Sequence, residues 1–241
     1  MPRLRADISG KRLRELMDAA LGVFCHQGFE RAQVADVAKA MGVAVGTVYL
    51  YVESKEALFD LVVRHTAATD PAWLDQLEIP VATPAPGSTV EFLHTTFGRH
   101  GQWPALAAAL KLDRAEDPRA ELEGVVREQY GLMKHHRYGL LLLMRSALEF
   151  PGLTEVFVHG LRKKLLGHLV RYLESRVKSG QFRPMPDPFA TAAVLTQSIA
   201  WANLQRPFDP GLSTLAEDTV EEATVEMLVH GLVLAPQPAL V

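Results

Sequence analysis

The sequence predicts an all-α protein with an N-terminal three-helix helix-turn-helix domain and a larger C-terminal helical domain. Apolar residues recur at helical spacing along the chain, and no segment shows the alternation of a β-strand. Near the N-terminus, two short apolar stripes flank a turn that contains glycine, which is the sequence form of a helix-turn-helix. Gly, Pro and capping residues then separate longer helical segments over the rest of the chain.

The N-terminal region contains four predicted helices. The first spans residues 11–27, ends before Gly28, and carries one apolar stripe of Leu13, Leu16, Met17, Ala20 and Phe24. The second spans 34–41 and ends at Gly42, and a third short helix follows within 44–52. Ser54 is a candidate N-cap for the helix that carries Leu58, Leu61 and Val62.

Residues 70–89 interrupt this pattern, because they hold four prolines and no helical period. We interpret them as a linker or long loop. Beyond them, a capping box at Ser88 and Glu91 and Asp-Pro pairs at 117–118 and 187–188 each predict a helix start. The predicted helices are 88–99, 103–113, 118–135, 138–149, 153–178, 187–205 and 213–234. We place the domain boundary between residues 1–66 and 67–241.

Composition narrows the class of protein. A chain of 241 residues can build one large or two modest domains, and its single cysteine, Cys25, excludes a disulfide or a cysteine-ligated zinc site within one chain. The N-terminus is charged, and the longest aliphatic run, residues 140–144, is too short to span a bilayer. We therefore expect a cytoplasmic protein without a membrane partner.

Charge is unevenly distributed. The net charge of −3 by itself argues against a nucleic-acid binder. Residues 1–64, however, hold nine Lys/Arg against eight Asp/Glu, whereas 65–241 hold sixteen against twenty. The first fourteen residues form a basic arm in which five basic residues, among them Arg3 and Arg5, face one acid, Asp7.

The short helix within 44–52 is the candidate functional element. In a helix-turn-helix the second helix enters the major groove of DNA, while flanking groups hold phosphates. If Val48 and Val52 form its buried side, then Gly46, Thr47 and Leu50 project outward, flanked by two tyrosines. Gly46 would permit close approach of the backbone, and Thr47 can bond a base edge or a phosphate. The alternative is a plain three-helix core in which the tyrosines only pack.

This region closely resembles the DNA-binding domain of the TetR family. The resemblance is carried, in fixed order, by residues 14–24 (RELMDAALGVF), 28–30 (GFE), 34–38 (VADVA), 42–49 (GVAVGTVY) and 54–58 (SKEAL). It implies that Gly46 and Thr47 lie at base edges and that Tyr49, Tyr51 and Lys55 lie at phosphates. The full set of expected DNA-binding residues is Arg3, Arg5, Gln33, Val45, Gly46, Thr47, Tyr49, Leu50, Tyr51 and Lys55.

The sequence departs from the family pattern at five positions. Ala32, Gln33 and Ala44 stand where Ser or Thr is usual, Val45 replaces Lys or Pro, and Leu50 replaces an aromatic residue or His. These changes remove helix caps and phosphate donors. We therefore expect few polar base contacts, with apolar contacts from Val45 or Leu50 to thymine methyl groups and a contribution from the basic arm.

For the C-terminal domain, the resemblance implies ligand binding and dimerisation. The last two long helices would form a four-helix bundle with a second copy through Phe189, Ala193, Thr196, Ile199, Ala200, Val220, Ala223, Met227 and Gly231. The alternative is that the apolar residues of both helices pack in the core of a single chain. The resemblance also implies that a small effector, which we expect to be largely apolar, releases a repressor from palindromic operator DNA. The residues expected to contact the effector are Phe92, Phe97, Trp103, Leu106, Leu110, Tyr130, Met133, Met144, Leu148 and Trp201.

Other functions have less support in the sequence. An enzyme built on Cys25 and His26 is disfavoured because adjacent helical residues diverge in direction. His135 and His136 diverge for the same reason, so we expect no metal site, and no cofactor. The remaining alternative is a helical partner-binding protein whose degenerate helix-turn-helix no longer reads operators.

Overall fold

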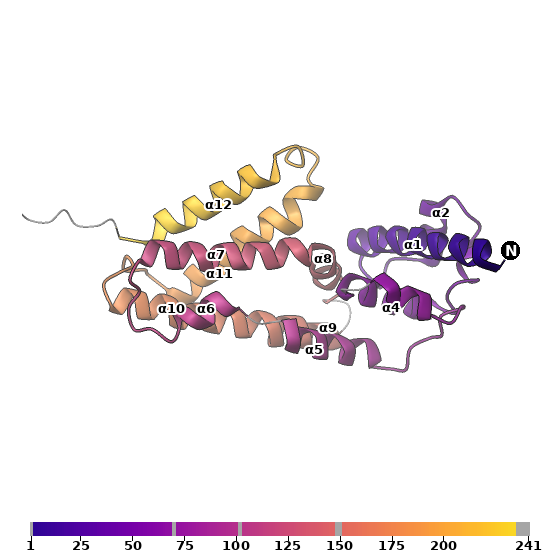
Figure 1. Ribbon diagram of the computed structural model, residues 1–241, viewed down its shortest axis with the longest axis horizontal. Helices are drawn as coiled ribbons and strands as arrows, with labels where there is room; N and C mark the ends of the chain where they lie inside the picture. The colour runs from indigo at the N-terminus through magenta and orange to yellow at the C-terminus, as the bar shows by residue number, and fades with distance from the viewer. Residues whose placement is uncertain (1, 69–70, 101–102, 148–150, 235–241) are drawn as a thin grey trace, which may run out of the picture. The chain divides into compact units, whose positions relative to one another are not determined.

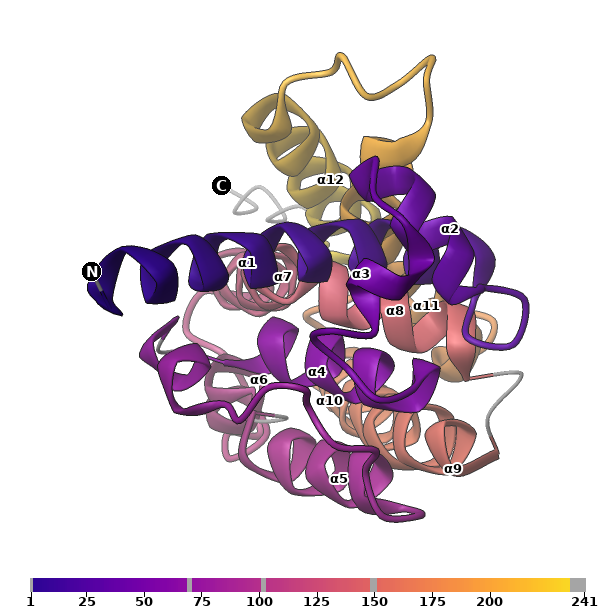
Figure 2. The same ribbon diagram turned by 90° about the vertical axis from the view of Figure 1, so that its right-hand side faces the viewer.

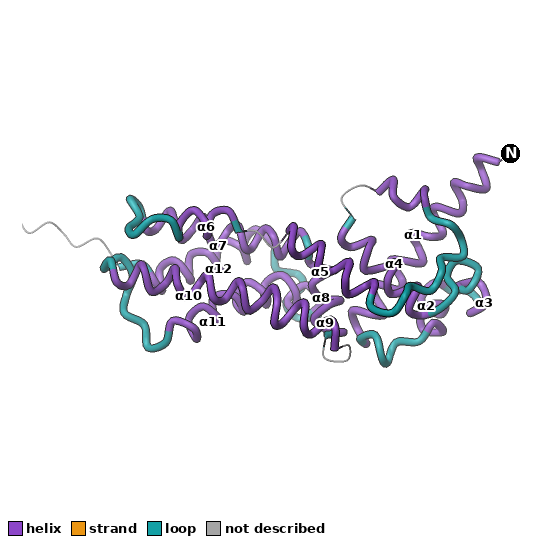
Figure 3. Tube along the Cα trace, turned by 90° about the horizontal axis from the view of Figure 1, so that it is seen from below, coloured by secondary structure: helices purple, strands orange, loops and turns teal. Residues whose placement is uncertain are grey.

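The computed structural model describes residues 2–68, 71–100, 103–147 and 151–234, without the side chains of 2–9, 71, 75, 97–100 and 151. Over these ranges the chain is all-helical, with loops and two isolated β-bridges (Figures 1 and 3). It divides into two compact units. The first contains residues 1–100 and 138–159, and the second contains 101–137 and 160–241. The predicted boundary after residue 66 stays a prediction.

The first unit begins with four helices, of which α1 packs against α2 and α4 (Figure 2). They are α1 (Pro2–Gln27), α2 (Val34–Met41), α3 (Val45–Val48) and α4 (Lys55–Ala67). The 3₁₀ helix η1 (Pro71–Gln76), α5 (Ser88–His100), α8 (Arg137–Ser146, from Tyr138 on) and α9 (Pro151–Thr154) complete the unit. α1 begins well before the predicted residue 11, because proline is tolerated at a helix start and Gly10 alone does not break a helix.

The core of the first unit follows the predicted stripes. Leu16, Met17 and Ala20 of α1 are fully buried, as are Leu58 and Val62 of α4. The rings of Phe24, Phe29 and Phe59 pack together, with centroids 5.2 Å apart between Phe24 and Phe59 and 4.8 Å between Phe29 and Phe59. This aromatic cluster fixes the end of α1 to α4.

The second unit is a bundle in which α7 packs against α6, α11 and α12, and α10 packs against α6 and α11. Its helices are α6 (Pro104–Ala109), α7 (Pro118–His135), α10 (Lys163–Lys178), α11 (Pro188–Ala200) and α12 (Glu217–Leu232). The two predicted aspartate caps are confirmed: Asp117 accepts from the N–H groups of Arg119 and Ala120, and Asp187 accepts from that of Phe189. Among the helices of the described residues, none is long and apolar enough to cross a membrane.

Two helices in the second unit are shorter than predicted, and buried arginines explain both. The carbonyl of Ala109, where α6 ends, accepts a hydrogen bond from Arg176, and the carbonyl of Leu215, just before α12, accepts one from Arg206. Two π-helical segments were not predicted. These are η2 (Glu155–Arg162), which joins α9 to α10, and η3 (Trp201–Gln205), which continues α11 into the short η4 (Arg206–Phe208).

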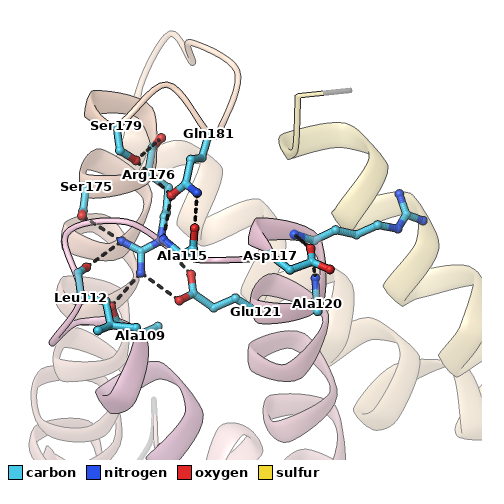
Figure 4. Close-up of polar contacts among 11 residues, drawn as sticks. Ala109, Leu112, Ala115, Asp117, Ala120, Glu121, Ser175, Arg176, Ser179 and Gln181 are labelled. Atoms are coloured by element: carbon cyan, nitrogen blue, oxygen red, sulfur yellow. Dashed lines mark hydrogen bonds and ion pairs between the residues drawn. The ribbon is translucent and has the colours of Figure 1, made fainter. Parts of the chain in front are cut away.

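Arg176 organises one end of the second unit (Figure 4). It is fully buried, and its guanidinium donates to both carboxylate oxygens of Glu121, at 2.7 and 3.0 Å, and to the carbonyls of Ala109 and Leu112. The charge is thus paired and hydrogen-bonded, as a buried charge must be. One side chain therefore connects α10 to α7 and to the loop after α6.

Candidate nucleic-acid interface

The first helix of the predicted motif, α2, has defined ends. At its start, the backbone N–H of Gln33 donates to the Asp36 carboxylate at 3.0 Å. At its end, Gly42 takes a left-handed conformation with φ of 68°, and its N–H donates to the carbonyl of Lys39. Because this conformation strains any residue with a Cβ, glycine sets the sharp turn between α2 and α3.

The second helix, α3, is a single turn. It is followed by turns in which Tyr51 and Val52 donate their N–H groups to the carbonyl of Val48, at 2.9 and 3.3 Å. Ala44, at the N-cap of α3, supplies no side-chain hydrogen bond, so the expected loss of this cap is confirmed. Residues 44–52 therefore form a short helical turn rather than one continuous helix.

This turn has one buried apolar side and one exposed side. Val48 is 1% exposed and Val52 is fully buried, as the sequence predicted. Val45, Tyr49 and Leu50 are exposed at 40%, 47% and 68%. Exposed apolar side chains clustered on a single turn indicate a surface that contacts something outside the chain.

Gly46 lies on the exposed side of the same turn. A Cβ atom built at this position meets no other atom of the described structure within 4 Å, and its φ is not positive. Neither packing within the chain nor backbone conformation therefore demands glycine here. The expected close approach of DNA to Gly46 stays a prediction.

Two of the expected phosphate contacts also have roles within the chain. Tyr51 is half-buried and packs against the core of the first unit. Lys55 donates to the carbonyls of Phe29 and Glu30, at 3.0 and 3.3 Å, and lies 4.4 Å from the centroid of the Phe29 ring. Because an ammonium group has three N–H donors, these contacts leave one for a phosphate.

The remaining members of the predicted set lie on α1, just before α2 and on α3. Gln33 and Gly46 are exposed, and Thr47 is half-buried. Arg3 and Arg5 belong to the first turns of α1 rather than to an extended arm, and their side chains lie outside the described part of the structure.

The predicted linker is hydrogen-bonded to the segment after α3, which sequence reasoning missed. The Val81 N–H donates to the carbonyl of Tyr51 at 2.8 Å, and the Glu53 N–H donates to the carbonyl of Val81 at 3.0 Å. Thr83 adds a hydroxyl hydrogen bond to Ser54 at 2.8 Å. The residues after α3 are therefore held by the segment 81–83. The one available signal was Val81 itself, an apolar residue among prolines.

The predicted dimer residues divide by exposure. Thr196, Ile199, Ala200 and Val220 are buried within the single chain, whereas Phe189, Ala223, Met227 and Gly231 are exposed and Ala193 is half-buried. Val194, which sequence reasoning missed, is 64% exposed on α11. An exposed apolar stripe therefore remains on each of the two helices.

The predicted ligand-binding residues lie in both units. Trp103, Leu106 and Tyr130 belong to the second core, with Leu110 and Met133 packed against it, whereas Trp201 is 40% exposed on η3. Phe92 packs against the first core, and Met144 is half-buried in the first unit. The Phe97 side chain and Leu148 lie outside the described residues.

Cys25, considered above as a nucleophile, lies in an apolar setting. Burial raises the pKa of its thiol to about 12, and the nearby charge of Arg145 only partly opposes this shift. The thiol is therefore protonated at neutral pH, which disfavours nucleophilic chemistry.

Comparison with known proteins agrees with this geometry. Residues 16–62 match the family model of the bacterial regulatory proteins of the tetR family. The chain is 25% identical over 230 residues to the HTH-type transcriptional repressor KstR2 of Rhodococcus jostii, and the match covers 94% of each protein. It is 45% identical over 42 residues to the fatty acid metabolism regulator protein of Bacillus subtilis, which covers 17% of this chain and 22% of that protein.

A solved structure shows the same fold. The ketosteroid transcriptional regulator KstR2 of Mycobacterium tuberculosis superposes with a TM-score of 0.54 at 19% identity, over 93% of this chain and 96% of that one. The relatives described above are named as regulators or repressors and not as enzymes. The helix-turn-helix geometry and the match to the family model show that residues 16–62 form a helix-turn-helix domain of the TetR family, and the chain is similar over most of its length to the transcriptional repressor KstR2.

Proposed function

We propose that the protein is a homodimeric repressor that binds a palindromic operator through α2 and α3 and leaves it when a small, largely apolar effector binds. In this proposal residues 1–66 bind DNA, and residues 67–241 bind the effector and the second copy. The observation that carries the proposal is the turn 45–50, where Val45, Tyr49 and Leu50 are exposed above buried Val48.

The proposed contacts with DNA are few and partly apolar. Gly46 and Thr47 face base edges, Val45 and Leu50 contact thymine methyl groups, and Tyr49 donates to a phosphate. Gln33, Tyr51 and Lys55 lie beside this set. Arg3 and Arg5 add charge at the start of α1. The double substitution of both by Gln should therefore flatten the salt dependence by about 0.9 for each phosphate that is no longer neutralised.

The homodimer is proposed on the exposed stripes of α11 and α12. A single helix-turn-helix buries little surface on DNA, so two copies about 34 Å apart gain affinity and read a palindrome. The stripe on α11 continues through exposed Val194 to Trp201, and the stripe on α12 is formed by Ala223, Met227 and Gly231. We therefore propose Trp201 for this interface rather than for the effector site.

The effector is proposed to bind among the apolar side chains of the second unit, near Trp103, Leu106, Leu110, Tyr130 and Met133. The names of two relatives refer to ketosteroids and to fatty acid metabolism. Both names point to molecules that are mainly hydrocarbon, which is the chemistry that such an apolar lining would bind.

A mobility-shift assay with the DNA that flanks the gene for this chain tests the proposal. The wild type should give one retarded complex whose affinity falls about tenfold or more in Leu50→Ala, since burying a leucine side chain contributes about 1.5–3 kcal/mol. Leu112→Ala is the matched control, because Leu112 is also an exposed leucine, at 53%, but lies in the second unit. Equal affinity of both variants would remove Leu50 from the interface, and the absence of a retarded complex would contradict operator binding and favour the partner-binding alternative.

A further inference from the structure

Two buried glutamines of the second unit have opposite hydrogen-bonding environments. Gln181 is 6% exposed and satisfied, because its Nε2 donates to the carbonyl of Ala115 at 2.7 Å and its Oε1 accepts from the N–H of Ala115 at 3.0 Å (Figure 4). Gln129 is 1% exposed, yet neither Nε2 nor Oε1 has a hydrogen-bond partner in the described part of the chain. The chain satisfies both polar groups of the Gln181 amide, whereas the described residues satisfy neither polar group of Gln129.

The position of Gln129 makes its unpaired amide unusual. It lies on the inner face of α7, three and four residues beyond Val126 and Val125, both of which are fully buried. A leucine would suit this apolar face, whereas a buried amide without a partner is unfavourable. A polar group kept at such a place indicates a partner from outside the chain.

Asn203 provides a second unpaired group. It is fully buried in η3, which packs against α7. Its Nδ2 donates to the carbonyl of Ile199 at 3.1 Å, but its Oδ1 has no partner among the described residues. η3 is a π-helical turn, and such turns are frequent at functional sites. The two amides together leave one NH₂ donor and two acceptor oxygens unused.

The balance of unused donors and acceptors restricts the class of ligand. The acceptor oxygens of Gln129 and Asn203 need a donor, and the Gln129 NH₂ needs an acceptor. A ligand carboxylate or phosphate only accepts hydrogen bonds, so it would leave both amide oxygens unpaired in a buried place. The amides therefore suit a neutral group.

We infer that Gln129 and Asn203 bind a neutral group that both donates and accepts hydrogen bonds, a hydroxyl or a carboxamide, on an otherwise apolar effector. Gln129 Nε2 donates to the ligand oxygen, and Asn203 Oδ1 or Gln129 Oε1 accepts the ligand O–H or N–H. The inference rests on the proposed function, because it names the class of effector that the second unit recognises.

Thermal unfolding of the ligand-free full chain is the first test. Gln129→Leu should raise the unfolding midpoint by about 2–4 °C, because it removes an unpaired buried amide. Gln181→Leu, the matched control, should lower it, because it leaves both polar groups of Ala115 unpaired. A fall in the midpoint for Gln129→Leu as large as that for Gln181→Leu would show that Gln129 is structural and would overturn the inference.

The second test measures the binding of defined probes. These are straight-chain alcohols from hexan-1-ol to dodecan-1-ol and the carboxylates of equal chain length. At least one alcohol should bind the wild type and raise its midpoint, and the matching carboxylate should bind more weakly. Gln129→Leu and Asn203→Leu should each weaken alcohol binding about tenfold, the effect of one lost hydrogen bond. Tighter binding of the carboxylate, equal binding by the variants, or no alcohol binding would overturn the inference.

Operator release, measured separately by mobility shift, distinguishes this inference from the proposed function. Alcohol binding that requires Gln129 but leaves the operator complex intact supports the amide site and contradicts its role in release. Operator release that is the same in wild type and Gln129→Leu supports an effector-controlled repressor and contradicts the amide site.

Discussion

Val81 is hydrogen-bonded to Tyr51, with its N–H 2.8 Å from the Tyr51 carbonyl oxygen. Thirty residues separate the two in the sequence, and the contact joins a proline-rich loop to the end of the proposed DNA-reading turn. The carbonyl of Val81 also accepts from Glu53, so both polar backbone groups of one loop residue hold the segment after α3.

Val81→Pro tests whether this loop positions the turn. Proline removes the N–H that binds Tyr51, so operator affinity should fall roughly three- to tenfold while helix content stays unchanged. Ala82→Pro is the control, because a proline there favours the extended conformation that Val81 already has in its β-bridge with Val52. Mobility shift and circular dichroism check both results, and equal affinity of the two variants would show that the loop is not needed.

Gly46→Ala separates packing within the chain from packing against DNA. The added methyl group meets nothing in the described structure, so the free energy of unfolding should be unchanged or rise by up to about 1 kcal/mol. Operator affinity should fall, and fall further in Gly46→Leu, because the side chain would hold the backbone away from the bases. Gly22→Ala on α1 is the control, since a Cβ there also meets nothing. Unchanged operator binding by Gly46→Leu would remove Gly46 from the interface.

Much of this architecture could be predicted from sequence because local signals set it. Helix ends are set within a few residues, as at Gly42, Asp117 and Asp187. The apolar stripe of α1 correctly predicts which of its residues are buried. The burial of Val48 and Val52 in the turn that follows α2 was predicted from the same periodicity.

The features that sequence reasoning missed depend on partners far along the chain. The role of Val81 depends on Tyr51, and the early end of α6 depends on Arg176, more than sixty residues later. The contrast between Gln129 and Gln181 is of the same kind, because no local pattern shows whether a buried amide has partners. Such pairings become visible only in three dimensions.

Arg176→Met should destabilise the second unit strongly. It keeps most of the apolar stem but removes the charge that Glu121 pairs with, and breaking a buried ion pair in this way costs about 3–5 kcal/mol. Arg171→Met, at an exposed position on α10, should change the free energy of unfolding by less than about 0.5 kcal/mol. Urea unfolding followed by circular dichroism measures both, and similar midpoints for the two variants would show that the ion pair adds little.

His65 makes the stability of the first unit depend on pH. Burial lowers the pKa of its imidazole below 6.5, Arg14 lowers it further, and Asp18 opposes the shift only in part. Because the unfolded chain then binds the proton more readily, stability is fully present above pH 6.5 and falls as the pH drops from 6.5 toward the folded pKa.

His65→Gln should make this fall shallower, with His26→Gln, at an exposed position on α1, as the control. His168 in the second unit also has a lowered pKa, so some pH dependence should remain in His65→Gln. Urea midpoints at pH 7.5, 6.5 and 5.5 measure the effect, and the same pH dependence in wild type and His65→Gln would mean that the folded and unfolded states bind this proton equally.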